Sequence, residues 1–295
     1  RRSARRVDYL AGNGCNDLAG LSSMPMNSQI QPVGALLRQW RQHRRLSQLD
    51  LACEADISTR HLSFVETGRA QPSREMLLLL AEQLDIPLRE RNRLLSAAGY
   101  APLFTQHALA EPAMAAARTA IELLLKAHEP YPALTIDRHW NLLAANSALA
   151  PFLQGIAPEL LTPPINVMRL SLHPQGLAPR IVNLGAWRAY LLARLQRDFQ
   201  ASGDAQLHAL WDELNAYPGP SAPAQFDSDT VLMPLQFASE QGVVSLIGTT
   251  TVFGTANDIT LAELALETFF PADAFSAQYL RDLAESTHLS DEITL

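Results

Sequence analysis

The chain has 295 residues, of which 47% are hydrophobic, so it is long enough for two domains that each have a core. A net charge of −7 argues against a protein that coats nucleic acid along its whole length, and two cysteines argue against a disulfide framework. The sequence has neither an apolar run of membrane-spanning length nor a signal peptide, which predicts a cytoplasmic protein with no membrane partner.

The charge is divided unevenly along the chain. Residues 33–100 contain ten Arg against eight Asp and Glu, whereas residues 101–295 contain nine Lys and Arg against twenty Asp and Glu. A mildly basic head on an acidic body is typical of a regulator that contacts DNA with one end. The acidic body should also weaken nonspecific binding to phosphates, because that binding is electrostatic.

The first hundred residues predict a leader followed by a small helical domain. Residues 1–30 match no known pattern, and we expect them to be a disordered leader. Residues 31–100 have apolar positions at helical spacing, which predicts a bundle of five helices. We expect the first helix at 33–45, a central pair within 46–69, and the last two at 74–84 and 88–98.

The central pair, LSQLDLACEADISTRHLSFVETGR, has the pattern of a helix-turn-helix. One helix begins at Ser47 and is followed by a tight turn at Asp56, a residue that tolerates the left-handed conformation expected there. Ser58 is a good N-cap for the next helix, and Gly68 suits its C-terminal end. Two short helices joined in this way place the second helix in the major groove of DNA.

The rest of the chain mixes helices and strands. We expect a linker and connecting helix at 101–130 and an α+β domain at 131–295. In that domain, ALTIDRHWNLLAAN predicts two short strands around a polar turn at Asp137–Arg138, and then a helix with Asn146 as its N-cap. Further on, the sequence predicts amphipathic helices at 181–200 and 204–217, strands at 230–238 and 243–253, and an apolar stretch at 263–271.

These motifs carry a resemblance to known proteins. Residues 33–100 resemble the Cro/repressor (xenobiotic-response-element, XRE) type of helix-turn-helix. The strings RHLSFVETGRAQPSREM and LRERNRLLSAAGYAP resemble the MmyB-like transcription regulators, and RHWNLLAAN, LHPQGLAPRIVN and FGTANDITLAELALETFFPAD extend the resemblance more diffusely. The resemblance implies a PAS-like antiparallel sheet with packed helices in the C-terminal domain. It also implies a pocket for a fatty acid or a similar amphipathic ligand.

The second helix of the pair is expected to read DNA. Arg60 is the main candidate because its guanidinium can bond guanine O6 and N7, although a phosphate or Glu66 are alternative partners. Phe64 suits a thymine methyl or the core. Gln48 resembles the family position that holds a phosphate oxygen, and Arg41, Arg44 and Arg45 are phosphate contacts or surface charges. The full set of predicted DNA contacts is Gln48, Ser58, Thr59, Arg60, Ser63, Phe64 and Arg69.

A carboxylate ligand would need a cationic or hydrogen-bonding partner at the mouth of the pocket. The polar segment around 166–183 offers such groups, and late apolar side chains offer a lining. The alternative is that the polar residues brace the domain and the apolar residues fill its core. The predicted ligand-binding residues are Arg169, His173, Arg180, Asn183, Trp187, Met233 and Phe237.

No catalytic motif or metal-ligand spacing stands out, so we expect neither an enzyme nor a metal site, and no cofactor apart from a bound lipid effector. One DNA-binding head covers few base pairs, which predicts a homodimer on double-stranded DNA. The alternative function is a protein-interaction module or antitoxin-like partner whose C-terminal domain is structural.

Overall fold

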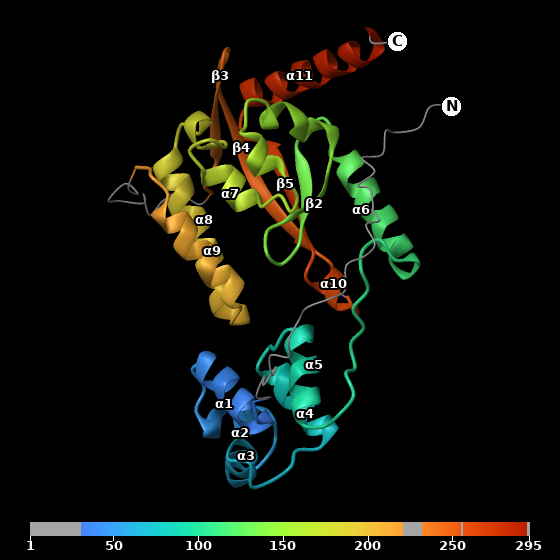
Figure 1. The fold of residues 1–295 in the computed structure, drawn as a ribbon, viewed down its shortest axis with the longest axis vertical. Helices are drawn as coiled ribbons and strands as arrows, with labels where there is room; N and C mark the ends of the chain where they lie inside the picture. Colours follow the sequence, from blue (N-terminus) through green and yellow to red (C-terminus); the bar gives the residue numbers. More distant parts are fainter. Residues whose placement is uncertain (1–30, 221–231, 255, 294–295) are drawn as a thin grey trace, which may run out of the picture. The chain divides into compact units, whose positions relative to one another are not determined.

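The computed structural model describes residues 31–220, 232–254 and 256–293 (Figure 1). It has the predicted α+β architecture, in which an N-terminal helical bundle with a helix-turn-helix precedes an antiparallel sheet with packed helices. The predicted disordered leader at 1–30 lies outside the described residues. In the described part, no helix combines the length and the apolar character needed to cross a membrane.

The N-terminal domain contains five helices, as predicted. Serine N-caps begin three of them: Ser47, Ser58 and Ser73 each accept a hydrogen bond from the backbone N–H three residues later, at 3.1 to 3.2 Å. Ser47 also forms a capping box with Asp50. The helices are α1 (Val33–His43), α2 (Gln48–Glu54), α3 (Thr59–Glu66), α4 (Arg74–Gln83) and α5 (Leu88–Ala97).

Tight turns and one close approach fix the helix-turn-helix. Asp56 has the predicted left-handed conformation, with φ at +51°, and Gly68 after α3 has φ at +74°. Ala52 is buried between the helices. At Gly34 on α1, an added Cβ would lie 2.2 Å from the carbonyl oxygen of Val65 on α3. A side chain at Gly34 would therefore push α1 away from α3.

The C-terminal region is built from helices of various lengths around a five-stranded sheet. Its helical elements are η1 (Pro112–Met114), α6 (Ala115–Ala127), η2 (Ser147–Leu153), η3 (Pro158–Leu161), α7 (Val167–Leu172), η4 (Ala178–Arg180), α8 (Leu184–Ser202), α9 (Ala205–Ala216), α10 (Ile259–Ala262) and α11 (Ala274–Ile293). Its strands are β1 (Ala133–Ile136), β2 (Leu142–Ala145), β3 (Leu235–Ser239), β4 (Gly242–Val252) and β5 (Ala265–Pro271).

The strands lie in the order β2-β1-β5-β4-β3, and every pair is antiparallel. Alternate residues of β1 serve two cores, as the period of a strand requires. Leu134 and Ile136 belong to the main core, to which α8 and α9 contribute. Ala133 belongs to a smaller cluster with residues of α6. The sheet is therefore covered on both faces (Figure 1).

Several elements differ from the sequence prediction. Asn146 does not cap a helix with its side chain; it is buried, and its amide bonds Ala133, Leu125 and Tyr131, so it ties β1 to α6. Part of the strand predicted at 230–238 lies outside the described residues, and β3 begins at Leu235, after a proline that lacks an N–H. The helix α11 was not predicted.

Candidate DNA-reading helix and ligand cavity

The helix α3 exposes the residue that the sequence singled out for base reading. Arg60 is exposed, and its guanidinium carbon lies 5.4 Å from the centre of the Phe64 ring. The guanidinium carbon of Arg69 lies 5.9 Å from the same ring. Cation–π contacts of this kind orient both arginines without using up their N–H donors.

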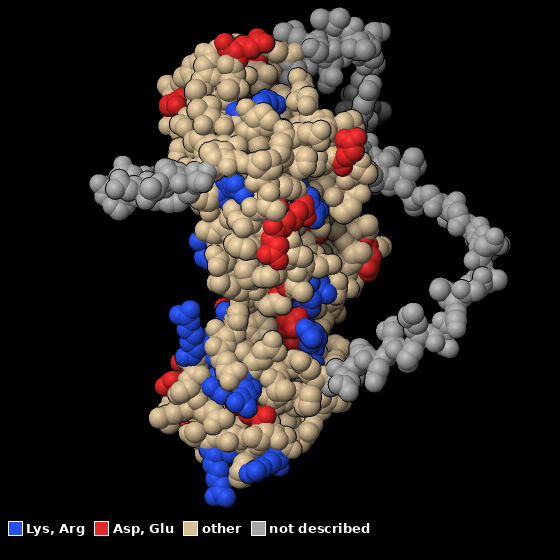
Figure 2. All heavy atoms as spheres, turned by 60° about the vertical axis from the view of Figure 1, so that its left-hand side comes forward, with Lys and Arg blue, Asp and Glu red and all other residues tan. Residues whose placement is uncertain are grey.

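The seven predicted DNA-contacting residues lie on α3, at its two ends, or at the start of α2. Phe64 is half-buried and is not among the side chains that pack against the helical core, which argues against the alternative in which it fills that core. Ser58, Arg60 and Arg69 are exposed, whereas Gln48, Thr59, Ser63 and Phe64 are half-buried. On the face drawn in Figure 2, several basic side chains lie over the helical domain.

A buried ion pair supports α3 from behind. Arg41 on α1 donates to both carboxylate oxygens of Glu66, from Nε at 2.6 Å and from the terminal nitrogen at 2.9 Å. Gln48 donates to Glu66 at 2.8 Å. Burial opposes ionisation of Glu66, but the hydrogen bonds from Arg41 and Gln48 outweigh it, so the pKa of Glu66 is lowered.

This arrangement corrects the prediction for two arginines. Arg41 is not a surface charge, since it is buried with Glu66 and also donates to the carbonyl of Leu46. Arg44 donates to the carbonyls of Leu84 and Asp85, where α4 ends. Arg41 and Arg44 therefore hold helices of the domain together. Glu66 was also considered as a partner for Arg60, but it bonds Arg41 and Gln48 instead.

The C-terminal domain contains a partly open apolar cavity of about 110 Å³ between the sheet and the helices α7 and α8. Its wall is formed mainly by aliphatic and aromatic side chains, which include Leu134, Trp140, Phe152, Met168, Trp187, Leu191, Met233, Phe237 and Phe269. One water molecule needs ~10–15 Å³ of such a cavity, so this cavity has room for roughly eight waters. A long ligand therefore has to displace some of the lining side chains.

The predicted ligand-binding residues divide into two groups. Trp187, Met233 and Phe237 line the cavity. The four polar candidates, Arg169, His173, Arg180 and Asn183, are not in its lining.

The structure gives each polar candidate a partner within the domain. Arg169 pairs with Glu213, with both N–O distances at 2.8 Å. Arg180 donates to the carbonyls of Phe152 and Gln154, and the Nδ1 atom of His173 accepts the N–H of Gln175. Asn183 bonds Pro234 and Gln236 and so holds the start of β3.

The charged residues in the cavity lining are Arg194 and Glu267, and they pair with each other. The terminal nitrogens of Arg194 lie 2.7 and 3.2 Å from the two oxygens of Glu267. The guanidinium carbon of Arg194 also lies 4.4 Å from the centre of the Trp140 ring, and Trp140 Nε1 donates to Asp198 at 3.1 Å. Burial raises the pKa of Asp198, although Trp140 and Arg194 oppose the shift.

Sequence reasoning missed Arg194, although a local signal was present. Trp187, Leu191 and Arg194 follow one another at intervals of four and three residues, so they share one face of α8. Extending the predicted face of Trp187 along the helix finds Arg194. Glu267 had no such signal, because its partner is 73 residues away in the sequence. In the described residues, no group of three or more His, Cys, Asp or Glu side chains is placed to hold a metal ion.

Comparisons with known proteins cover both domains. Residues 117–283 match the family described as "MmyB-like transcription regulator ligand binding domain", and residues 37–91 match a family described as "Helix-turn-helix". Neither description is that of an enzyme. No curated protein matches the sequence.

One solved structure, "Structure of an RNA-binding Light-Oxygen-Voltage Receptor", matches with 13% identity over 89% of this chain and 65% of its own, at a TM-score of 0.23. The chain thus spans 65% of the length of that receptor.

Proposed function

Because the chain belongs to the family of MmyB-like transcription regulators, we propose that it reads DNA with α3 and responds to an apolar-chain amphiphile in the cavity of its C-terminal domain. The observation that carries the proposal is the presence of an exposed arginine on α3 and an apolar cavity in the same chain. Double-stranded DNA is the partner, and the cytoplasm is the compartment in which the protein would meet it.

On DNA, Arg60 would bond a guanine and Phe64 would contact a thymine methyl in the major groove. Arg69 and Ser58 are exposed beside them and suit phosphate oxygens. Gln48 is well placed for the same role, because an amide nitrogen has two hydrogens and Glu66 takes one of them.

The ligand would be fatty-acid-like, with its chain in the cavity. Burial of each methylene stabilises the complex by ~0.8 kcal/mol, so affinity should rise about fourfold per methylene until the chain fills the space. Since Arg194 is already paired with Glu267, the lining that the structure describes offers a carboxylate no unpaired cation. Selectivity should therefore depend on the chain more than on the head group.

We expect a homodimer on a two-fold DNA site, because a single helix in one major groove contacts few base pairs. Sedimentation of the full chain with and without a DNA duplex measures this. A strictly monomeric complex would contradict the dimer but not the reading role of α3.

The main test measures DNA and ligand binding by one preparation. Fluorescence anisotropy with duplexes from the DNA upstream of the protein's own gene should give an affinity that depends on sequence and falls with salt. The fluorescent fatty acid cis-parinaric acid should bind the C-terminal domain and change that affinity. Mass spectrometry of molecules released from the purified protein would identify the natural ligand. Absence of DNA binding would favour the interaction-module alternative.

A cavity-filling substitution gives a more specific prediction. A Cβ at Gly248 would lie 3.4 Å from the ring of Phe269, and both residues line the cavity, so Gly248→Leu should occupy ligand space. If it excludes about three methylenes, cis-parinaric acid should bind with a loss of about 2.4 kcal/mol, or roughly 50-fold. Fluorescence titration of the full chain measures the effect.

Gly254→Leu is the matched control, because it makes the same chemical change where a Cβ meets no atom within 4 Å. The control should bind the probe as the unmodified chain does. Equal binding by Gly248→Leu and Gly254→Leu would place the ligand somewhere other than this cavity.

A further inference from the structure

The turn between β1 and β2 connects the ligand cavity to the DNA-binding domain. Asp137 holds this turn together, since its carboxylate accepts the backbone N–H groups of His139 and Asn141, both at 2.8 Å, and the side-chain amide of Asn141. Within the turn, Trp140 has φ at +66°, which is unfavourable for a residue with a bulky side chain. The turn is therefore a tightly bonded unit that stores backbone strain.

One side of this turn forms part of the cavity wall. The indole of Trp140 lines the apolar cavity, and it also lines a second, open pocket of about 600 Å³ whose lining includes charged side chains. Arg194 lines both cavities as well and lies against the indole. The side chains of Trp140 and Arg194 therefore separate the two cavities. A ligand that is too long for the apolar cavity would displace these side chains.

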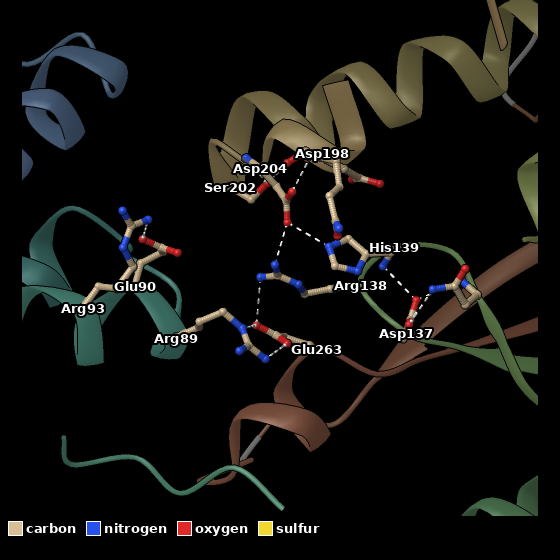
Figure 3. Close-up of polar contacts among 12 residues, drawn as sticks. Arg89, Glu90, Arg93, Asp137, Arg138, His139, Asp198, Ser202, Asp204 and Glu263 are labelled. Atoms are coloured by element: carbon tan, nitrogen blue, oxygen red, sulfur yellow. Dashed lines mark hydrogen bonds and ion pairs between the residues drawn. The ribbon is translucent and has the colours of Figure 1, made fainter. Parts of the chain in front are cut away.

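The other side of the turn is linked through Glu263 to a residue of the helix-turn-helix domain. Arg138 lies 2.7 Å from an oxygen of Asp204 and 3.5 Å from an oxygen of Glu263. Arg89 on α5 donates to both oxygens of Glu263, at 2.9 and 2.8 Å. Figure 3 shows the resulting chain of contacts, in which His139 also bonds Asp204.

The two ion pairs at Glu263 are suited to being made and broken. The side chains of Arg89, Arg138 and Glu263 are 28%, 31% and 19% exposed, so water can replace the contacts when they separate. The Arg41–Glu66 pair inside the helical domain has side chains only 9% and 1% exposed, and its separation would leave a buried charge. The contact at Glu263 can therefore change while each domain stays folded.

We propose that Trp140 and Arg138 transmit the occupancy of the apolar cavity to the DNA-binding domain through the Glu263–Arg89 ion pair. The proposal rests on the proposed function and names how the ligand would regulate it. A ligand that displaces Trp140 moves a turn whose backbone is fixed by Asp137, and Arg138 leaves Glu263. The Glu263–Arg89 ion pair then weakens, and α5 is no longer held in one position. The affinity for DNA changes as a result.

The test compares DNA affinity with and without saturating cis-parinaric acid in the full chain. In the unmodified protein the probe should change the Kd for DNA by about fivefold or more, the lower end of typical allosteric coupling. In Glu263→Gln the ratio of the two Kd values should fall to within twofold of one, while the affinity for the probe stays within twofold. Arg138→Met removes the partner of Glu263 on the β1–β2 turn, and it should abolish the effect of the probe on DNA affinity in the same way.

Glu90→Gln is the matched control. Like Glu263→Gln it removes one negative charge, but Glu90 lies on α5 and bonds Arg93 of the same helix. It should keep the coupling of the unmodified protein. Hydrogen exchange adds a readout that needs no DNA: the probe should change exchange in α5 of the unmodified protein and of Glu90→Gln, but not of Glu263→Gln.

The outcomes separate this proposal from the one on which it rests. If the unmodified protein binds the probe and its DNA affinity responds, but Glu263→Gln and Arg138→Met respond equally, the relay is wrong and the proposed function stands. If the unmodified protein shows neither probe binding nor a response, the proposed function fails, and the relay fails with it.

Discussion

Replacement of Glu66 by alanine should destabilise the helix-turn-helix domain by about 3–5 kcal/mol, the range for removing one partner from a buried ion pair. The side chain of Glu66 is 1% exposed, and it accepts hydrogen bonds from Arg41 and Gln48. Without the carboxylate, the guanidinium of Arg41 stays buried with no charge to balance it. Hydrogen exchange of the amides in α1 and α3 of the full chain measures the loss as a lower local free energy of unfolding.

The double variant Arg41→Met/Glu66→Leu is the control for this reading. Both charges are removed together, so no uncompensated charge remains, and stability should return to within about 1–2 kcal/mol of the unmodified domain. A double variant as unstable as Glu66→Ala would show that the carboxylate acts through something other than its ion pair.

Acid should also destabilise the helix-turn-helix domain, because it neutralises the carboxylate of Glu66. The pKa of Glu66 is lower in the folded protein than the ordinary value of 4.5. A lowered pKa means that the ionised form contributes stability above about pH 4.5, and that this contribution is lost as the pH falls through the lowered value. The free energy of unfolding of the domain should therefore decrease as the pH falls from about 5 through the lowered pKa of Glu66, and the decrease should be smaller in Glu66→Gln.

The features of this fold that could be predicted from sequence are those determined by a few neighbouring residues. A serine caps a helix through the N–H three residues later, and Asp56 and Gly68 adopt left-handed conformations where the chain must turn. The five helices of the first domain followed from such signals and from apolar spacing. In the second domain the α+β class could be predicted, because helical and strand-like patterns occur in separate runs within one compact region.

The partners of polar side chains could not be predicted, because they come from distant parts of the sequence. Arg41 and Glu66 are 25 residues apart, and Arg169 and Glu213 are 44 apart. A cluster of polar residues near 166–183 therefore suggested a ligand site, whereas in the structure these residues bond neighbouring elements. The apolar lining was easier to anticipate, since Trp187 and Phe237 lie on inward faces of predicted elements.

Replacement of Arg60 by alanine should have the largest effect on DNA recognition. An arginine that bonds one guanine through both O6 and N7 contributes ~1–3 kcal/mol of discrimination, and two heads on a two-fold site would lose about 2–6 kcal/mol together. The side chain is exposed and belongs to no core cluster, so the domain should remain folded. Anisotropy titrations on the cognate duplex and on one with the guanine replaced measure the loss and its sequence dependence.

Arg69→Ala is the informative comparison, because this arginine also lies against Phe64 but follows α3, where the DNA backbone would pass. Its loss from both heads should weaken binding to cognate and altered duplexes alike and reduce the slope of log K against log salt by about two, one for each head. Arg60→Ala should instead remove the preference for guanine at one position. If Arg60→Ala weakens binding equally on both duplexes, Arg60 contacts a phosphate, and the base-reading role must belong to other residues of α3.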